Sequence, residues 1–168
     1  ANKIVSAEKF LDSIDNIMED NKIDVVFTVI HGPYGEDGTI QGMFELMRLP
    51  YVGCGVTSSA VCMDKVLQKN ICQAYNIPVT PYFWFTKGQW QSDKSGTLSN
   101  LISKFGESSY PLFIKPANQG SSIGITKAHN KEELLAGIEL AFTRDIKIIV
   151  ELGVPNTREI ECAVLGTN

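Results

Sequence analysis

The apolar run IDVVFTVI, at residues 23–30, limits the folds open to this chain more than any other feature. It is rich in β-branched residues and apolar on both faces, which is typical of a parallel strand buried in an α/β sheet. The run stops at His31-Gly32, and a glycine-rich loop, a helix over residues 40–47 and a short strand at 51–55 are expected to follow. This strand–helix–strand order predicts an α/β unit with ligand groups at the carboxyl ends of its strands.

Helical periodicity also appears on both sides of this unit. Apolar residues recur at helical spacing over residues 7–20. A longer helix is expected from Ser58 to about Tyr75, with Leu67 and Ile71 on its inward face.

After Asn76 the pattern changes to that of an α+β unit. Two prolines within residues 77–85 predict an edge strand or extended connection, and residues 87–97 predict a polar surface loop. The other predicted elements alternate along the chain: a helix at 98–105, strands at 111–117 and 122–128, a helix from the capping pair Asn130 and Glu133 to Phe142, a buried strand at 146–151 and a strand at 158–166. The sequence therefore predicts the end of an α/β domain, up to residue 53, followed by an α+β unit.

Charge and composition exclude several kinds of partner. Fifteen Lys and Arg against nineteen Asp and Glu leave a formal net charge of −4, with no basic cluster dense enough for a nucleic-acid or membrane surface. The longest apolar runs are strand-sized, and the amino end lacks the apolar core of a signal peptide.

The four cysteines form no CxxC pair, so we expect reduced, mostly buried thiols in a cytosolic protein. Because the chain starts with Ala and stops after a strand-like run, we expect it to be part of a longer protein.

The stretch KPANQGSSIG, at residues 115–124, is compatible with two roles. Its glycines and serines can hold phosphate oxygens, or they can form an ordinary polar turn between two strands. Lys115, at the end of an apolar strand, either faces an anion or extends its ammonium to solvent. Taken alone, the stretch is better explained as a turn. The chain has no GxxxxGK[ST] loop and no GxGxxG between a strand and a helix, which argues against a P-loop or a dinucleotide fold.

Five other polar residues are also compatible with either a structural or a functional role when each is taken alone. His31 ends a strand, so it is either a core histidine or a ligand contact. Glu36 can simply charge a helix start, and Lys65 can be a solvated helix lysine. Glu151 and Glu159 bracket a loop and can be surface acids. Their joint order, rather than any one of them, indicates a function.

Four motifs carry a family resemblance. HGPYGEDGTIQGMFELMRLPYVGCG, SSAVCMDK, PLFIKPANQGSSIG and VELGVPNTREIECAVLG follow one another in that order over almost the whole chain. The chain closely resembles the D-alanine–D-alanine ligases of the ATP-grasp superfamily. This resemblance implies that residues 1–53 end a Rossmann-like amino-terminal domain, that residues 54–151 form the central ATP-grasp subdomain, and that residues 152–168 start the carboxyl-terminal ATP-grasp domain.

The resemblance also implies an activity and its partners. Ligases of this family join two D-alanines for peptidoglycan synthesis, with ATP forming an acyl phosphate on the first before the amine of the second attacks. ATP and Mg²⁺ are the implied cofactors, with the metal ligands expected beyond Asn168, so this segment alone should be inactive. A homodimer formed through the amino-terminal domain and a bacterial cytoplasmic location are implied as well. Two alternatives stay open: a D-alanine–D-lactate or D-alanine–D-serine ligase, and a non-catalytic nucleotide-binding module.

The residue roles that the resemblance implies fall into two groups. In the nucleotide group, Lys65 and Lys115 hold phosphates, and the loop with Gly120, Ser121 and Ser122 closes over them. Phe113 is the apolar wall beside adenine. Glu151 and Val154 belong to the segment that reads the adenine edge, and Glu159 is the acid that holds the ribose. The D-alanine group comprises His31 and Glu36, near the first D-alanine, and Ser121, which joins the substrate-side hydrogen-bond network. Gln119 departs from the acid that some members carry there.

Overall fold

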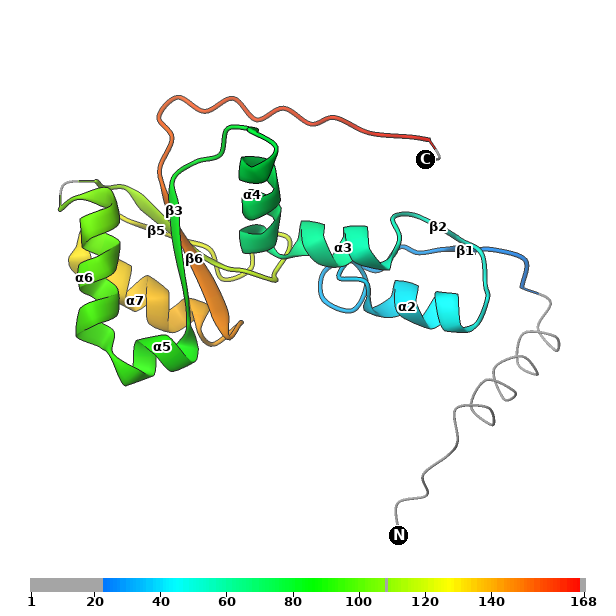
Figure 1. Ribbon diagram of the computed structural model, residues 1–168, viewed down its shortest axis with the longest axis horizontal. Helices are drawn as coiled ribbons and strands as arrows, with labels where there is room; N and C mark the ends of the chain where they lie inside the picture. The colour runs from blue at the N-terminus through cyan, green and yellow to red at the C-terminus, as the bar shows by residue number, and fades with distance from the viewer. Residues whose placement is uncertain (1–22, 108, 167–168) are drawn as a thin grey trace, which may run out of the picture.

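The computed structural model describes residues 23–107 and 109–166, which form two groups of elements (Figure 1). We call residues 23–63 the amino lobe and residues 64–152 the sheet lobe. The helix expected over residues 7–20 lies outside the described residues. The mixture of helices and strands confirms the α/β class.

The amino lobe contains a parallel strand pair, as the sequence predicts. β1 (Val26–Phe27) pairs in parallel with β2 (Tyr51–Val52), and α2 (Thr39–Leu46) connects them. The expectation that the first strand is buried is wrong, since the Phe27 side chain is 71% exposed. Within the described residues β2 is the one partner of β1, and two strands alone cannot cover both faces of a sheet.

The start of α2 is held by an aspartate, and its buried face by an aromatic pair. The two Asp37 carboxylate oxygens accept hydrogen bonds from the backbone N–H groups of Tyr34 and Thr39. Phe44 is buried, with its ring centroid 5.5 Å from that of Tyr51. α2 is therefore fixed at its start and packed against β2.

The single helix expected from Ser58 to Tyr75 is in fact two helices, α3 (Val56–Met63) and α4 (Lys65–Ala74). Asp64 separates them with an extended backbone conformation, φ −82° and ψ 103°. Its carboxylate accepts hydrogen bonds from the first free N–H groups of α4. An aspartate in this role begins a new helix, which is why apolar periodicity could not reveal the break.

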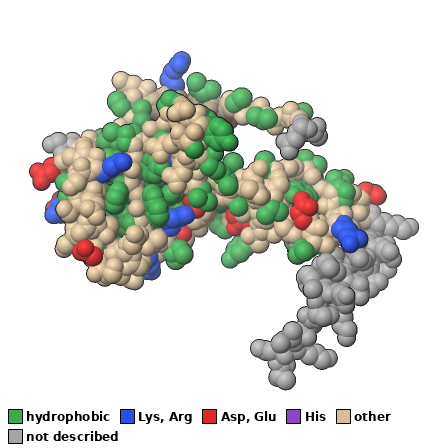
Figure 2. Space-filling model, viewed as in Figure 1, with side chains coloured by type: hydrophobic (Ala, Val, Ile, Leu, Met, Phe, Trp, Pro, Cys, Tyr) green, Lys and Arg blue, Asp and Glu red, His purple; other side chains and the backbone are tan. Residues whose placement is uncertain are grey.

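The break also changes which side of α4 is buried. Val66 is 2% exposed and packs against Ala117 and Ile149. Leu67 and Ile71, predicted to face inward, are 44% and 43% exposed. Figure 2 shows hydrophobic side chains exposed on the surface of the lobe that contains α4.

The sheet lobe is built on a four-stranded sheet in which all neighbours are antiparallel. In spatial order its strands are β3 (Tyr82–Thr86), β6 (Lys147–Leu152), β4 (Leu112–Pro116) and β5 (Thr126–Ala128). The predicted edge position of β3 and the burial of β6 are confirmed. β5 is shorter than expected, because Ser121 and Ser122 have positive φ angles of 48° and 58° and form a turn instead.

Three helices cover one face of this sheet, and α4 lies on the other (Figure 1). They are α5 (Lys87–Ser92), α6 (Lys94–Phe105) and α7 (Lys131–Ala141). The predicted cap of α7 is confirmed, since the Asn130 side chain accepts a hydrogen bond from the Glu133 N–H. The core between sheet and helices consists of Phe85, Trp90, Leu101, Leu112, Ile114, Ala128, Leu134, Ile138, Ala141, Phe142, Ile148 and Val150.

The prediction of a polar loop over residues 87–97 is wrong. Thr86 and Gln89 form a capping box that starts α5, and α6 begins two residues after α5 ends, at Lys94. Trp90 is 2% exposed, and its Nε1 donates a 2.9 Å hydrogen bond to Glu139. One aromatic residue among polar neighbours has no periodicity, so only the packed core reveals its burial.

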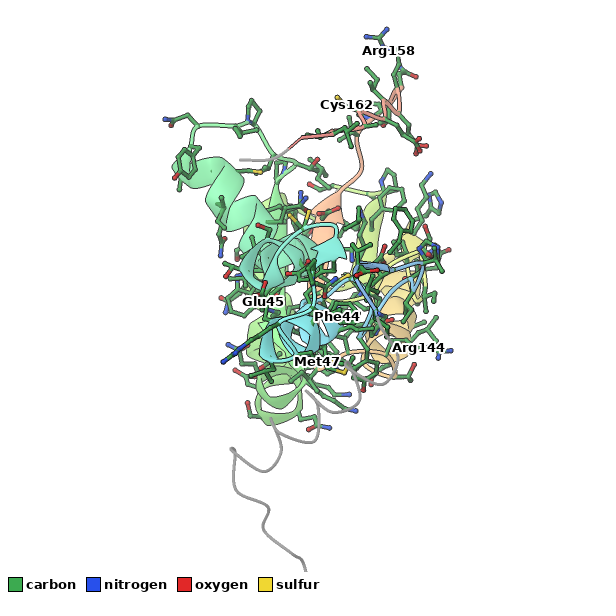
Figure 3. The ribbon with its side chains drawn as sticks, turned by 90° about the vertical axis from the view of Figure 1, so that its right-hand side faces the viewer. Phe44, Glu45, Met47, Arg144, Arg158 and Cys162 are labelled. Carbon is green, nitrogen blue, oxygen red and sulfur yellow. The ribbon has the colours of Figure 1, made fainter. Side chains whose placement is uncertain are left out.

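The strand expected over residues 158–166 is also wrong. This segment is exposed, and β6 ends at Leu152. Figure 3 shows Arg158 and Cys162 extending away from both lobes. Alternating side chains form a strand only where a neighbouring strand pairs their backbone, and the described residues supply no such neighbour here.

The cysteines are free, but they are less buried than expected. Cys54, Cys62 and Cys162 are exposed, and Cys72 is half-buried. None of the four belongs to the core clusters of the described residues. Of the helices in the described part of the chain, none has the length and apolar character needed to cross a membrane.

Candidate functional site

The sheet face opposite α5, α6 and α7 carries the polar candidates from β4 and β6. Along β4, Leu112 and Ile114 point into the core, so Phe113 and Lys115 point to the opposite face. Glu151 on β6 stands directly beside Phe113 in the β4–β6 register. Strand alternation thus explains why Lys115 and Glu151 point away from the core although apolar residues flank them in sequence.

Glu151 is the centre of this face. Its Oε2 lies 2.6 Å from Nζ of Lys115, and its Oε1 lies 2.9 Å from Nζ of Lys69. The side chain of Glu151 is only 9% exposed. Burial raises the pKa of the carboxyl, but hydrogen bonds from Lys115 and Lys69 outweigh it, so the pKa lies below its ordinary value. Glu151 is therefore a buried carboxylate shared by two ammonium groups.

α4 supplies two lysines to the same place. Lys65 and Lys69 are four residues apart on the helix and so project from one side of it. The Lys65 Nζ donates to the backbone carbonyls of Ala117 and Gln119, which joins α4 to the loop after β4. Burial, and then the charge of Lys115, hold the pKa of Lys65 below its ordinary value.

An ion pair at the start of α4 fixes the helix to the sheet. The carboxylate of Asp64, which caps α4, also pairs with the ammonium of Lys147 on β6. The backbone N–H of Lys65 donates a 3.0 Å hydrogen bond to the Ala117 carbonyl. Because Asp64 and Lys147 neutralise each other, the excess positive charge of the site comes from Lys65, Lys69 and Lys115. Lys69 and Lys115 share one carboxylate, Glu151, while Lys65 lies near Glu151 and Asp145. These three lysines outnumber the two carboxylates, so the site is net positive and suits a polyanion.

An aromatic ring lies beside these charges. The Phe113 ring centroid is 5.8 Å from Nζ of Lys115 and 5.7 Å from Nζ of Lys127. Phe113 is half-buried, so part of its ring remains free to contact a ligand. An apolar surface next to cationic groups is the combination that a nucleotide requires, with its flat base and charged phosphates.

The loop over residues 117–125 joins β4 to β5 as a hairpin, as predicted. Asn118 anchors its base, because both its backbone N–H and its side-chain amide donate to Asp145. Ser121 and Ser122 at the tip are exposed. The loop therefore has a fixed base and a tip whose hydroxyl and amide groups can reach a ligand.

The second part of the site lies in the amino lobe. Oε2 of Glu36 accepts a 2.6 Å hydrogen bond from the Gly32 N–H, and its Oε1 lies 3.7 Å from Nδ1 of His31. Gln41 on α2 is buried, and its Nε2 donates to the Gly35 carbonyl at 2.9 Å. These bonds hold the glycine-rich loop in one conformation, with Glu36 beside His31.

The two parts meet at Gly120. A Cβ atom built on Gly120 would lie 3.6 Å from Oε2 of Glu36 and 3.8 Å from the Gly32 Cα. The hairpin loop therefore touches the glycine-rich loop of the amino lobe. A cavity of about 300 Å³ adjoins this contact, with Thr28, Ile30, His31, Glu36, Gln41 and Ser59 among its lining residues.

Most of the predicted site residues are thus brought together, but two are not. Val154 and Glu159 follow β6 on the exposed segment, and no hydrogen bond or ion pair joins either side chain to the sheet lobe within the described residues. The last backbone anchor before them is the Gly153 N–H, which donates to the Pro111 carbonyl at 2.9 Å.

Sequence reasoning missed two residues of this arrangement, Lys69 and Gln41. The four-residue spacing from Lys65 could have indicated Lys69, because it places both lysines on one side of a helix. For Gln41 the motif that contains it was noticed, but its contact with Gly35 required the folded loop.

Comparisons with known proteins agree with one another. The family model described as "D-ala D-ala ligase C-terminus" matches residues 71–168, and "D-ala D-ala ligase N-terminus" matches residues 3–54. The D-alanine–D-alanine ligase of Acetivibrio thermocellus is 50% identical over 147 residues, which is 88% of this chain and 38% of that protein. The enzyme of the same name from Clostridium novyi is 48% identical over 152 residues, or 90% of this chain and 43% of the relative.

Solved structures show the same similarity. A D-Ala:D-Ser ligase from Enterococcus faecalis matches with a TM-score of 0.70 and 44% identity, over 78% of this chain and 36% of that chain. A D-alanine–D-alanine ligase from Bacillus anthracis matches with a TM-score of 0.70 and 33% identity, over 84% of this chain and 43% of that chain. The chain thus spans about two fifths of the length of the relatives it matches.

Proposed function

Because the chain belongs to the D-alanine–D-alanine ligase family, we propose that the protein containing it joins two D-alanines for peptidoglycan synthesis, using ATP. A carboxylate oxygen of the first D-alanine attacks the γ-phosphorus of ATP, which gives an acyl phosphate and ADP. The amine of the second D-alanine attacks the acyl carbon, loses a proton and displaces phosphate, which forms the peptide bond.

The observation that supports this proposal most directly is the convergence of Lys65, Lys69 and Lys115 around Glu151. Phosphoryl transfer depends on positioning and charge neutralisation, and ammonium groups in a partly buried site provide both. In this proposal Lys65 and Lys115 hold phosphate oxygens. The amides and hydroxyls of Gly120, Ser121 and Ser122 close over them, as a lid that excludes water from the acyl phosphate.

The base and ribose are assigned to the same face and to the segment after it. We propose that Phe113 forms the apolar wall beside adenine, because its ring is half-exposed next to Lys115. Glu151 and Val154 read the adenine edge, and Glu159 holds the ribose hydroxyls. For Val154 and Glu159 this requires the exposed segment to lie against the nucleotide in the complete protein.

The first D-alanine is assigned to the contact between the lobes. His31 and Glu36 lie beside each other next to the cavity of about 300 Å³. Ser121 lies next to Gly120, which touches Glu36. The same loop therefore links the phosphate end and the substrate end, as transfer of phosphate to a D-alanine carboxylate requires.

The metal is proposed to be held elsewhere. In residues 23–107 and 109–166 no group of three His, Cys, Asp or Glu side chains could hold a metal ion. We therefore assign Mg²⁺, which neutralises phosphate charge when bound, to ligands outside these residues. The segment alone should accordingly be inactive. The domain boundaries after residues 53 and 151 remain part of the proposal.

The location and assembly are proposed from the activity and from the surface. Because ATP and D-alanine are the substrates, the reaction is assigned to the bacterial cytoplasm. The amino lobe exposes Val25, Phe27 and Val52 around its strand pair, an apolar surface suited to contact with further protein. We assign the homodimer to this lobe, and light scattering of the complete protein tests it.

Release of ADP on addition of D-alanine tests the proposed activity in the complete protein. We expect release that depends on both D-alanine and ATP, and no release with L-alanine. ADP formation at the same rate with and without D-alanine would contradict the assignment.

A second candidate is a D-alanine–D-serine ligase. It is favoured by the similarity to a D-Ala:D-Ser ligase at 44% identity. A product assay with D-alanine, D-serine and D-lactate in competition decides between them, because each second substrate gives a product of different mass.

A further inference from the structure

Lys69 is held in the sheet lobe by groups of different kinds. Its Nζ lies 2.9 Å from Oε1 of Glu151 and 5.4 Å from the centroid of the Tyr82 ring. The Thr80 carbonyl accepts a longer hydrogen bond from it, at 3.4 Å. The side chain is 15% exposed, so Lys69 is a component of the buried cluster rather than a solvated helix lysine.

The two oxygens of Glu151 have separate partners. Lys69 binds Oε1 and Lys115 binds Oε2, so each ammonium has one oxygen to itself. A carboxylate this deeply buried is costly when it loses its counter-charge. With Lys69 in place, Glu151 remains paired even if Lys115 moves away.

We propose that Lys69 is a positioning residue of the nucleotide site: it keeps Glu151 paired, so that Lys115 can exchange Glu151 for a phosphate oxygen. This inference rests on the proposed function, in which Lys115 contacts phosphate. It adds a residue that touches no nucleotide and acts through Glu151.

The charges in the cluster explain why this residue is needed. Without the charge of Lys69, Glu151 and Lys115 would form a closed, neutral pair. Binding of phosphate by Lys115 would then leave a buried carboxylate alone, and that cost would weaken the phosphate contact. With Lys69 present, exchange of partners leaves every buried charge compensated.

The experiment measures binding of ATP and of adenosine to the complete protein by titration calorimetry. We expect Lys69→Met to weaken ATP binding about tenfold, comparable to one charge-assisted hydrogen bond. Lys69→Arg should restore most of it, because the charge is kept. Adenosine, which has no phosphate, should bind Lys69→Met as well as it binds the unaltered protein. A purely structural role would weaken both ligands.

A double variant tests whether Lys69 acts through Glu151. In Glu151→Gln the neutral amide needs no counter-charge, so adding Lys69→Met should cost much less than tenfold. This double variant leaves no buried carboxylate unpaired, and the Lys115 ammonium that loses its partner is 25% exposed, so the variant also serves if Lys69→Met folds poorly. Lys131→Met is the matched control. It removes one exposed lysine from the first turn of α7, on the opposite face of the sheet, and should leave ATP binding unchanged.

The outcomes separate the inference from the function it rests on. Unaltered ATP affinity in Lys69→Met, or equal losses from Lys69→Met with and without Glu151→Gln, overturns the inference. If Lys115→Met binds ATP as the unaltered protein does, the phosphate role of Lys115 and the inference both fail. If Lys115→Met weakens ATP binding and Lys69→Met does not, only the inference fails.

Discussion

The ammonium of Lys115 lies 2.6 Å from Oε2 of Glu151, although the two residues come from strands that meet only in the folded sheet. In the antiparallel register, Lys115 stands beside Ile149 and Phe113 stands beside Glu151. Lys115 must therefore extend along the sheet to reach the carboxylate. This pair defines the face on which a nucleotide is proposed to bind, and the first two predictions concern it.

Lys115→Met should weaken ATP binding by about tenfold to a hundredfold, because one charge-assisted contact with phosphate is lost. Titration calorimetry on the complete protein checks this. Lys127→Met is a suitable control, since Lys127 lies at a similar distance from the Phe113 ring but is exposed. Equal losses in both variants would show that general positive charge, rather than Lys115, attracts the nucleotide.

Glu151 should make the free energy of unfolding depend on pH in the acid range. Its folded-state pKa lies below its ordinary value, so the carboxylate stabilises the folded state fully above the unfolded pKa of about 4.3. That contribution should disappear as pH falls from there through the lower, folded-state pKa. Urea unfolding of the chain and of Glu151→Gln at pH values between 7 and about 3 checks it. Parallel stability curves for both proteins over this range would contradict the assignment.

Asp64→Ala should destabilise the chain by about 3 kcal/mol, because it removes the cap of α4 and leaves the Lys147 ammonium without its partner. Asp93→Ala is the matched control: Asp93 caps α6 through the Gly96 N–H, and it is exposed. Loss of that cap alone should cost about 1 kcal/mol. Denaturant unfolding measures both, and similar values would show that the ion pair to β6 contributes little.

Gly124→Ala should distort the hairpin loop. Gly124 has a φ of +74°, and an added Cβ would come within 2.9 Å of Pro116 Cγ. We expect a loss of about 1–3 kcal/mol in unfolding free energy, and slower D-alanine-dependent ADP release in the complete protein. Gly88→Ala, in α5, is the control, since its Cβ would meet the nearest atom at 3.9 Å. If both variants lose the same stability, the loop conformation is not the cause.

Periodicity and turn chemistry identified much of the fold from the sequence. β3, β4 and β6 lie where apolar or proline-bounded runs predict them, and the α7 cap is the one that Asn130 indicates. The hairpin around Lys115 was also predicted. These features depend on residues close together in the chain, which is why local patterns reveal them.

Several of the wrong predictions concern segments whose structure depends on residues far away in the sequence. The helix break at Asp64 depends on a carboxylate that also pairs with Lys147, far along the chain. Burial of Trp90 depends on α7, which supplies Glu139 to its indole N–H. The alternating run over residues 158–166 has the pattern of a strand but no partner strand among the described residues. The Asp64 cap and the Thr86–Gln89 capping box are local signals that apolar periodicity does not detect, whereas the burial of Trp90 and the pairing of Asp64 with Lys147 depend on tertiary contacts.

The candidate site divides in the same way. By itself the sequence determined the family and the order of its motifs, because these are properties of neighbouring residues. Only the tertiary structure decided that Lys65, Lys69 and Lys115 surround Glu151 and that Gly120 touches Glu36. The physical reason is that charges act through space over a few ångströms. The separation along the chain does not predict which charges will be neighbours.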